Sequence, residues 1–392
     1  MTLDQASATA PATSQRLEWA NALRGVAALT VAVWHLGMAF FVFPDVAAII
    51  TNYPDPAAVG PWEPAQTLSA SGVDLGAFGI TLFFMISGLV ISRSLRHYTR
   101  FAFFVARCLR LLPTYAVGYL VICLTVAIVQ WRTAGTVTLQ ADTVLWGIIP
   151  GLGLLLSRPV VPIGIDWTLI VEISFYAICL VIYRPLVQRR WVPVATVAGI
   201  VVAEEFFIRT SAFVDTPAHG VYAVATLVLP FLPLLLIGVV VAQPTPWRSW
   251  SGALSILAIF GAYLWMSRYT SPLSNFASYR ITVGVTVIVF LLVATFGGGW
   301  RKHRFTTFLA DISYPLYVVH LVVGFAVMFP LAKAGWPPLV LLAMGLMTTV
   351  ALAWAIHVLV ELPTHRVGSR IARQLSSQLA AAPTGSDPNR AR

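Results

Sequence analysis

Charged residues are scarce in this sequence. They make up 10% of the 392 residues, whereas soluble domains carry about 25%. Hydrophobic residues make up 58% of the chain, and the mean hydropathy is +0.82. So few charges cannot cover a water-exposed surface along the whole chain, which excludes a soluble globular protein. The composition predicts an integral membrane protein.

Cysteine is also rare, and this narrows the chemistry. The three cysteines, Cys108, Cys123 and Cys179, lie in apolar segments without paired spacing. We interpret them as small core residues, so neither disulfides nor metal ligands are expected. The sequence has no Cys-x-x-Cys or His-x-x-x-His metal spacing, no Gly-x-Ser-x-Gly nucleophile motif and no phosphate-binding glycine loop. No metal site is therefore expected.

Acidic residues are outnumbered by basic ones, 15 to 25, which gives a formal net charge of +10. The basic residues stand between apolar runs, and no soluble basic region exists to hold a duplex. A nucleic-acid partner is therefore not expected. The positive-inside rule, by which basic residues collect in cytoplasmic loops, explains the excess instead.

Apolar runs long enough to cross a bilayer recur along the chain. We predict about ten spans, and hence an all-α, polytopic membrane helix bundle with the lipid bilayer as a partner. The predicted spans are 22–43, 73–92, 103–130, 166–183, 193–209, 220–242, 251–268, 276–297, 312–331 and 338–360. A further apolar stretch, 143–156, is short and broken by Gly and Pro, and it predicts a re-entrant or interfacial segment.

The distribution of basic residues predicts the orientation. With the N-terminus inside, the inner segments hold 18 of the 25 basic residues and the outer segments hold 6. Both termini are therefore expected in the cytoplasm. Residues 1–20 form a polar tail without the apolar core of a signal peptide, so the first span is expected to be retained. Residues 21–363 form the membrane domain, and 364–392 form a polar tail expected to be disordered.

Two ionisable residues interrupt the first span. Arg24 and His35 are 11 residues apart, which places them on nearly the same face of an α-helix, about 16 Å from each other. Ionisable side chains at membrane depth are costly unless they line a cavity or find partners. A lone His in an apolar helix is usually structural, but its pairing with Arg favours a functional site.

A cluster of arginines leads into the third span. Arg107 and Arg110 are neighbours on a helix and can grip one polyanion through forked hydrogen bonds. Arg93, Arg96 and Arg100 precede them. Anchoring to the inner leaflet would explain an isolated pair, whereas the whole cluster suits the docking of a phosphorylated cofactor from the cytoplasm.

A carboxylate lies within the fourth predicted span. Thr168, Glu172 and Tyr176 share a helix face by their i, i+4 spacing, and Trp167 stands beside them. Glu172 is expected to pair with His35 or with an arginine, because an unpaired carboxylate in an apolar span is costly. A structural ion pair between two helices is an equal alternative to a catalytic role.

Ser313, Tyr317 and His320 follow one another at i, i+4 and i+7, which predicts a polar stripe on one helix face. We interpret this stripe as packing and substrate lining, and not as a proton-transfer group. Trp167 and Tyr176 are expected to contribute to the same lining.

Taken together, these segments resemble the acyltransferase family 3 membrane proteins, which include bacterial O-antigen, exopolysaccharide, nodulation-factor and macrolide O-acyltransferases. The resemblance runs from about residue 18 to 363. The elements that match the family's motifs are Arg24 with His35, Phe83-Phe84-Met-Ile-Ser87-Gly88, Arg107 with Arg110 and Pro113, Trp167-Thr168-Leu169 with Glu172, Phe175 and Tyr176, Ile312-Ser313-Tyr314 with His320, and Glu361 with Pro363. In this order they are specific.

The resemblance implies transfer of an acyl group, with acetyl expected, from cytoplasmic acyl-CoA to a hydroxyl of a carbohydrate or glycoconjugate. Acyl-CoA, and acetyl-CoA first, is then a donor substrate and not a permanently bound cofactor. His35 is the candidate general base or transient acyl carrier, with Glu172 orienting it. Arg24, Arg107 and Arg110 are the candidate donor-binding residues. A multi-pass protein of the cell inner (cytoplasmic) membrane is expected.

Two departures from the family pattern stand out. Asn21 occupies the position where many members carry Asp, three residues before the arginine, which removes a carboxylate partner for Arg24. The SGNH-type domain that members often carry is not found, so a separate periplasmic or extracellular acyl-handling protein is expected if acyl handover requires one.

The competing hypothesis is a secondary transporter or exporter of a small molecule or lipid-linked sugar. Such proteins also combine many spans with intramembrane charges and broken segments. They usually have related halves, however, and no internal repeat is evident in this sequence, which favours the enzyme.

Overall fold

The computed structural model describes residues 12–209, 216, 218–268 and 276–381, and every regular element in them is a helix. The long helices are α1 (Ala12–Trp34), α5 (Leu75–His97), α6 (Arg100–Ala134), α9 (Asp166–Ile182), α11 (Trp191–Arg209), α12 (His219–Val228), α13 (Leu232–Ala242), α14 (Trp250–Met266), α15 (Phe276–Phe296), α16 (Arg304–Lys333), α17 (Pro338–Ile356) and α18 (Leu362–Ala381). The short helices are α2 (Phe40–Val42), α3 (Pro44–Thr51), α4 (Glu63–Ala70), α7 (Ala141–Gly147), α8 (Leu152–Leu155) and α10 (Arg184–Gln188).

The all-α membrane bundle expected from the sequence is confirmed. Within the described residues, eight helical stretches are long and apolar enough to cross a membrane. The two other predicted spans are also helices, α9 and α14, with 17 residues each. The broken segment 143–156 forms only the short helices α7 and α8, joined by a turn at Gly151 with φ +77°.

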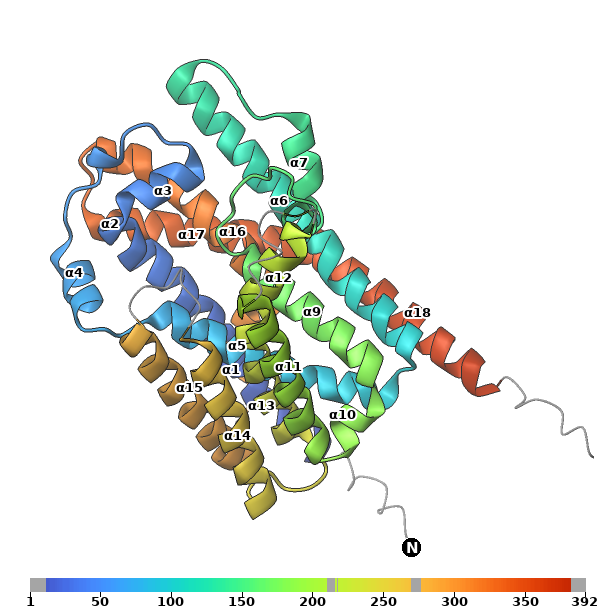
Figure 1. Ribbon diagram of the computed structural model, residues 1–392. Helices are drawn as coiled ribbons and strands as arrows, with labels where there is room; N and C mark the ends of the chain where they lie inside the picture. The colour runs from blue at the N-terminus through green and yellow to red at the C-terminus, as the bar shows by residue number, and fades with distance from the viewer. Residues whose placement is uncertain (1–11, 210–215, 217, 269–275, 382–392) are drawn as a thin grey trace, which may run out of the picture.

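Three helices, α1, α5 and α16, form the centre of the bundle. α16 lies along α1, α6 and α17, and α5 lies between α1 and α13. Figure 1 shows α1 and α5 near the middle, with α14 and α15 on one side and α6 with α18 on the other. Polar residues on α1, α5 and α16 can therefore face protein and cavities instead of lipid.

The helix α1 does not end at Trp34 but continues into a π-helical turn, η1 (His35–Ala39). A π turn inserts a residue into a helix and is frequent at functional sites. Beyond it the chain folds back over the end of the bundle, where α3 lies beside α16 and α4 lies beside η1. This lid-like layer and the start of α5 surround the region next to His35.

The tail beginning at residue 364, which we expected to be disordered, is helical as far as Ala381. This correction has a packing cause. Gly368 and Ala372 are one helical turn apart and buried, and α18 lies along α6 on this face. Arg366 and Arg370 are exposed. The segment is thus an amphipathic helix stabilised by one narrow face, which its polar composition alone conceals. Residues 382–392 lie outside the described part.

Two glycines allow α5 and α13 to touch backbone to backbone. A methyl group at Gly88 would overlap the carbonyl oxygen of Leu235, and one at Gly238 would overlap the carbonyl oxygen of Met85. Each glycine therefore accommodates the other helix, and small residues at a helix interface are the usual means of such close approach in membranes.

We predict that Gly88→Ala destabilises the protein. Forcing the helices apart costs about 1–3 kcal/mol, which exceeds the gain in helix propensity of about 1 kcal/mol. The matched control is Gly261→Ala on α14, where a methyl group would meet no atom within 4 Å. Thermal unfolding in detergent should show a lower Tm for the first variant and an equal or higher one for the second. Equal stability of the two variants would contradict the close approach.

Candidate functional site

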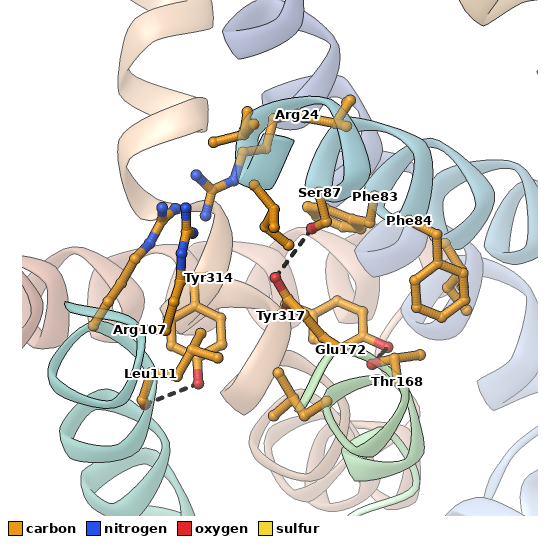
Figure 2. Close-up of a pocket in the computed structure, with 16 residues that line it drawn as sticks. Arg24, Phe83, Phe84, Ser87, Arg107, Leu111, Thr168, Glu172, Tyr314 and Tyr317 are labelled. Carbon is orange, nitrogen blue, oxygen red and sulfur yellow. Dashed lines mark hydrogen bonds between the residues drawn. The ribbon is translucent and has the colours of Figure 1, made fainter. Parts of the chain in front are cut away.

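Three arginines converge on one cavity in the bundle. The cavity, called the arginine cavity below, has a volume of about 70 Å³ and receives Arg24 from α1 and Arg107 and Arg110 from α6. Its walls are mainly apolar and include Phe83 and Phe84 of α5. Figure 2 shows the guanidinium groups of Arg24 and Arg107 on the same side of this cavity, pointing toward each other. The structure thus brings the three predicted donor-binding residues together.

Arg107 is held firmly although it carries a charge into the bundle. Its side chain is 7% exposed and donates a hydrogen bond to Ser94 Oγ. The guanidinium lies over the rings of Phe103 and Tyr176, at 5.5 and 5.6 Å from their centroids. These aromatic contacts stabilise a cation without neutralising it.

The arginine cluster has an excess of positive charge. In the part of the chain that the structure describes, no carboxylate lies within 4 Å of Arg24, Arg107 or Arg110. Glu172 and Glu361 attract Arg24 from a longer distance, whereas Arg110 repels it. Such a cluster is arranged to receive an anion that the protein itself does not supply.

Glu172 lines the arginine cavity but not in the way we predicted. Its Oε1 atom accepts hydrogen bonds from Ser87 Oγ at 3.1 Å and from the Tyr176 hydroxyl at 2.6 Å; Figure 2 draws the first of these. Of the two predicted partners, His35 is not in contact with Glu172, whereas the arginines share its cavity but form no ion pair with it within 4 Å among the described residues. Spacing along α9 correctly placed Tyr176 beside Glu172, but it could not reveal which other helix faces them.

The partner of His35 is instead His320. His35 Nδ1 lies 2.9 Å from His320 Nε2, and the two rings are 5.1 Å apart. The other ring nitrogen of His320, Nδ1, lies 2.9 Å from the carbonyl oxygen of Tyr317 and 3.1 Å from that of Leu316. The interpretation of His320 as part of a packing stripe therefore did not predict its hydrogen bond with His35.

These contacts determine the tautomers of both neutral rings. A carbonyl oxygen only accepts, so His320 carries its proton on Nδ1 and presents an unprotonated Nε2. His35 must then donate from Nδ1, which leaves the lone pair of its own Nε2 free. The arrangement is one imidazole held by a second, which is anchored in turn by backbone carbonyls.

His35 lines a different cavity from Arg24. This second cavity, called the histidine cavity below, has a volume of about 460 Å³. It lies among η1, the layer of α3 and α4, the start of α5, α15 and α16, and is bordered by Trp34, Asp74 and Tyr279. Arg24 and His35 thus share α1 but serve two cavities.

Successive turns of α16 border the two cavities. Tyr317 lines the arginine cavity, and its hydroxyl is hydrogen-bonded to Thr168 Oγ1 at 2.8 Å. The Tyr317 ring lies 5.8 Å from that of His320, which in turn holds His35. Leu321, four residues after Tyr317, already lines the histidine cavity. Four residues of helix rise about 6 Å, so the cavities are close neighbours.

A third cavity leads to the arginine cavity from the side of α18. This mouth cavity has a volume of about 550 Å³ and shares Arg24 and Arg110 with the arginine cavity. Its other border includes Arg93, His97 and Arg373. An anion that enters here passes basic residues all the way to the arginine cluster.

The remaining predicted lining residues lie behind the cavities. Ser313 donates to the carbonyl oxygen of Ala310 at 2.7 Å and borders none of the three cavities. Trp167 packs on Phe231, with ring centroids 4.8 Å apart. Tyr176 supports Glu172 and Arg107 from outside the cavity. Among the five predicted lining residues, Tyr317 is the one that borders any of these three cavities.

Sequence reasoning missed several residues that border these cavities. Ser87 belonged to a matched motif, but nothing local indicated its bond to Glu172. Asp74, Tyr279 and Trp34 carry no common spacing, and only the fold brings them together. Among the residues that the structure describes, no cluster of three or more His, Cys, Asp or Glu side chains could hold a metal ion.

Comparison with known proteins gives the family. A family described as an acyltransferase domain, acyltransferase family 3, matches residues 17–358. No curated protein and no solved structure matches the chain. The matched range covers most of the sequence and contains all three arginines, both histidines of the pair and Glu172. The chain therefore belongs to acyltransferase family 3 and is a multi-pass membrane acyltransferase.

Proposed function

We propose that this protein transfers an acyl group, acetyl in the first instance, from cytoplasmic acyl-CoA to a hydroxyl of a carbohydrate or glycoconjugate in the cell inner membrane. The observation that carries the proposal is the cluster of Arg24, Arg107 and Arg110, which has no close carboxylate among the described residues. It shares its cavity with Tyr317, whose ring lies 5.8 Å from that of His320 in the His35–His320 pair.

The arginine cluster suits the donor. Coenzyme A carries several phosphates, and guanidinium groups bind phosphate through charge-assisted, forked hydrogen bonds. The mouth cavity adds Arg93 and Arg373 along the approach. The mainly apolar arginine cavity behind the cluster suits the less polar arm of the donor and its short acyl group, which would bring the thioester toward Tyr317.

His35 is the proposed base. Its Nε2 lone pair removes the proton from the acceptor hydroxyl as the oxygen attacks the thioester carbon. The carbon–sulfur bond then breaks, and the departing thiolate of coenzyme A takes the proton from the His35 imidazolium. In the alternative order, Nε2 attacks the thioester carbon, the carbon–sulfur bond breaks and the thiolate of coenzyme A leaves. The acceptor hydroxyl then attacks the acyl-histidine, the bond between Nε2 and the acyl carbon breaks, and the hydroxyl proton goes to the thiolate. Both orders require the same free nitrogen.

His320 is a positioning residue in this proposal. By accepting the Nδ1–H of His35, it selects the tautomer in which Nε2 is basic and supports the positive charge that forms when Nε2 takes a proton. Glu172, for which we had predicted this role, acts in the donor site instead. It holds Ser87 and partly balances the charge of Arg24.

His35→Ala should abolish acyl transfer. Loss of general-base catalysis costs about 10²–10⁴-fold in rate, and removal of an acyl carrier costs more. Purified variant and parent protein are incubated with acetyl-CoA labelled in the acetyl group, and release of coenzyme A is followed. The matched control is His219→Ala, since His219 is exposed and borders none of the three cavities. Undiminished turnover of the first variant would reject the role of His35.

His320→Ala should lower kcat and leave the KM for acyl-CoA near its parent value. The base survives in this variant, but its tautomer is no longer fixed, and a loss of about 10- to 100-fold is expected for a residue that supports another. Steady-state kinetics with varied acyl-CoA separates the two constants. A rise in KM with unchanged kcat would place His320 in donor binding instead.

Arg110→Gln, alone and with Arg107→Gln, should weaken binding of coenzyme A. Each lost charge-assisted hydrogen bond is worth about 1.5–3 kcal/mol, or roughly 10- to 100-fold in affinity. The remaining affinity should also depend less on salt. Titration calorimetry with coenzyme A at two ionic strengths measures both effects. The control is Arg132→Gln, at the far end of the same helix. Equal affinities in all variants would mean that Arg107 and Arg110 do not bind coenzyme A and only help to set the orientation of the helix in the membrane.

A further inference from the structure

The polar groups that border the arginine cavity lie at different depths. Arg24 and Arg110 also border the mouth cavity, whereas Ser87 and Glu172 border the arginine cavity alone among the three. In the view of Figure 2, the hydrogen bond between Ser87 and Glu172 lies between the guanidinium groups and Thr168. A ligand that enters through the mouth therefore passes the arginines before it meets Glu172.

The hydroxyl groups on the described border of this cavity each have a partner within the protein. Ser87 donates to Glu172 Oε1 at 3.1 Å, and the Tyr314 hydroxyl donates to a backbone carbonyl of α6 at 3.0 Å. The hydroxyls of Thr168 and Tyr317 are hydrogen-bonded to each other at 2.8 Å. These groups are therefore satisfied before any ligand arrives.

One oxygen of Glu172, in contrast, is left open. Oε1 accepts from Ser87 and, at 2.6 Å, from Tyr176. Oε2 has neither a hydrogen-bond partner nor an ion pair within 4 Å among the described residues. It keeps accessible surface, unlike the unpartnered carboxylate oxygens of Glu204, which are fully buried. A charged acceptor that is open to a mainly apolar cavity gains a strong hydrogen bond when a ligand donates to it.

The groups that remain unsatisfied define the ligand of this cavity. The arginines donate and carry positive charge, whereas Glu172 Oε2 accepts and carries negative charge. Apolar side chains, including Ile80, Phe84 and Leu169, form most of the remaining border. A ligand that suits these groups has an anionic end at the mouth and an N–H or O–H donor on a slender, less polar arm. Coenzyme A thioesters have this order, with phosphates first, then amide groups, then the thioester.

Spacing along α9 indicates which donor of the arm reaches Glu172. Thr168, Glu172 and Tyr176 stand on successive turns, about 6 Å apart along the helix. Arg107 lies over the ring of Tyr176 at one end, and Thr168 is bonded to Tyr317 at the other. A short ethylene linker separates the thioester sulfur from the nearest amide nitrogen. An amide held at Glu172 would therefore leave the thioester within reach of Tyr317.

We propose that Glu172 Oε2 accepts a hydrogen bond from the amide N–H nearest the thioester of the donor and thereby recognises its pantetheine arm. The assignment rests on the proposed acyl transfer and adds a specificity-determining residue to the donor site. Ser87 and Tyr176 hold the carboxylate through Oε1, so that Oε2 remains for the arm. The arginines bind the phosphates, and Glu172 fixes how far the arm enters.

The first experiment separates the arm from the phosphates. Titration calorimetry compares coenzyme A with adenosine 3′,5′-bisphosphate, which carries phosphates but no arm. Glu172→Gln keeps an oxygen for Ser87 and Tyr176 and replaces Oε2 by an NH₂ group, which donates only. This variant should lose roughly 10- to 100-fold in affinity for coenzyme A. It should lose none for the bisphosphate, because removal of a negative charge does not weaken the attraction between arginine and phosphate.

Two further variants serve as controls for this measurement. Glu204→Gln neutralises a buried carboxylate of α11 that borders none of the three cavities, and it should bind both ligands as the parent does. Arg110→Gln should weaken both ligands together. Equal losses for the two ligands in Glu172→Gln, or no loss for coenzyme A, would overturn the role of Glu172. A parent protein that binds neither ligand would reject the proposed donor itself.

The second experiment changes the ligand instead of the protein, so it does not depend on the folding of a variant. N-acetylcysteamine reproduces the thiol end of the arm, and N-acetyl-N-methylcysteamine lacks its N–H. The first compound should displace coenzyme A from the parent at a concentration about 10-fold lower than the second, and Glu172→Gln should show almost no preference. Equal displacement from the parent would overturn the hydrogen bond. A preference for the N–H in a protein that never transfers an acyl group would leave this contact standing and reject the reaction.

Discussion

The hydrogen bond between His35 and His320 joins α1 to α16 at the border of two cavities. Its direction follows from the backbone carbonyls that occupy His320 Nδ1. Because these carbonyls belong to the turn of α16 that precedes His320, the helix itself orients one ring and thereby the other. An imidazole pair of this kind needs no buried carboxylate, whose desolvation would be costly at this depth. The apolar bundle can thus hold an imidazole whose free nitrogen is defined by geometry.

The separation of charge between the cavities has a related physical basis. A low-dielectric bundle strengthens each electrostatic interaction. The arginine-rich cavity and the cavity whose described border has no Arg or Lys therefore present different environments a few residues apart along α16. Arg107 is tolerated because rings and a hydroxyl, not a carboxylate, surround it. An internal ion pair would have neutralised this charge, which the proposed binding of a phosphate requires. The absence of Asp at position 21 is consistent with the same requirement for Arg24.

Several parts of this arrangement could be predicted from the sequence. Apolar runs gave the helices, and spacing within one helix correctly placed Arg107 with Arg110 and Tyr176 with Glu172. Contacts between helices were harder to predict from the sequence. The pairing of His35 with Glu172 was wrong because a helical face can be assigned locally, whereas its opposite partner depends on how helices cross. Tyr279 and Asp74 meet only through the packing of α15 and the start of α5. The helix α18 was missed because its composition is polar. A narrow face of small residues is enough to stabilise it, since α6 provides a surface against which that face packs.

The helical register of α1 and η1 explains how one continuous segment can place side chains in both cavities and also pack against the aromatic core. Regular α-helix runs from Arg24 to Trp34, and His35 follows as the first residue of the π turn, so Arg24 and His35 both turn toward α16. One additional residue shifts the following helical positions by about 100°. Phe40 therefore points toward Phe325 and Phe329, with ring centroids 5.4 and 5.0 Å apart, and seals the aromatic core beyond the cavity. With regular α-helical geometry, either this aromatic packing or the orientation of the histidine would be lost. The π turn thus allows a stable core together with an imidazole that borders a cavity.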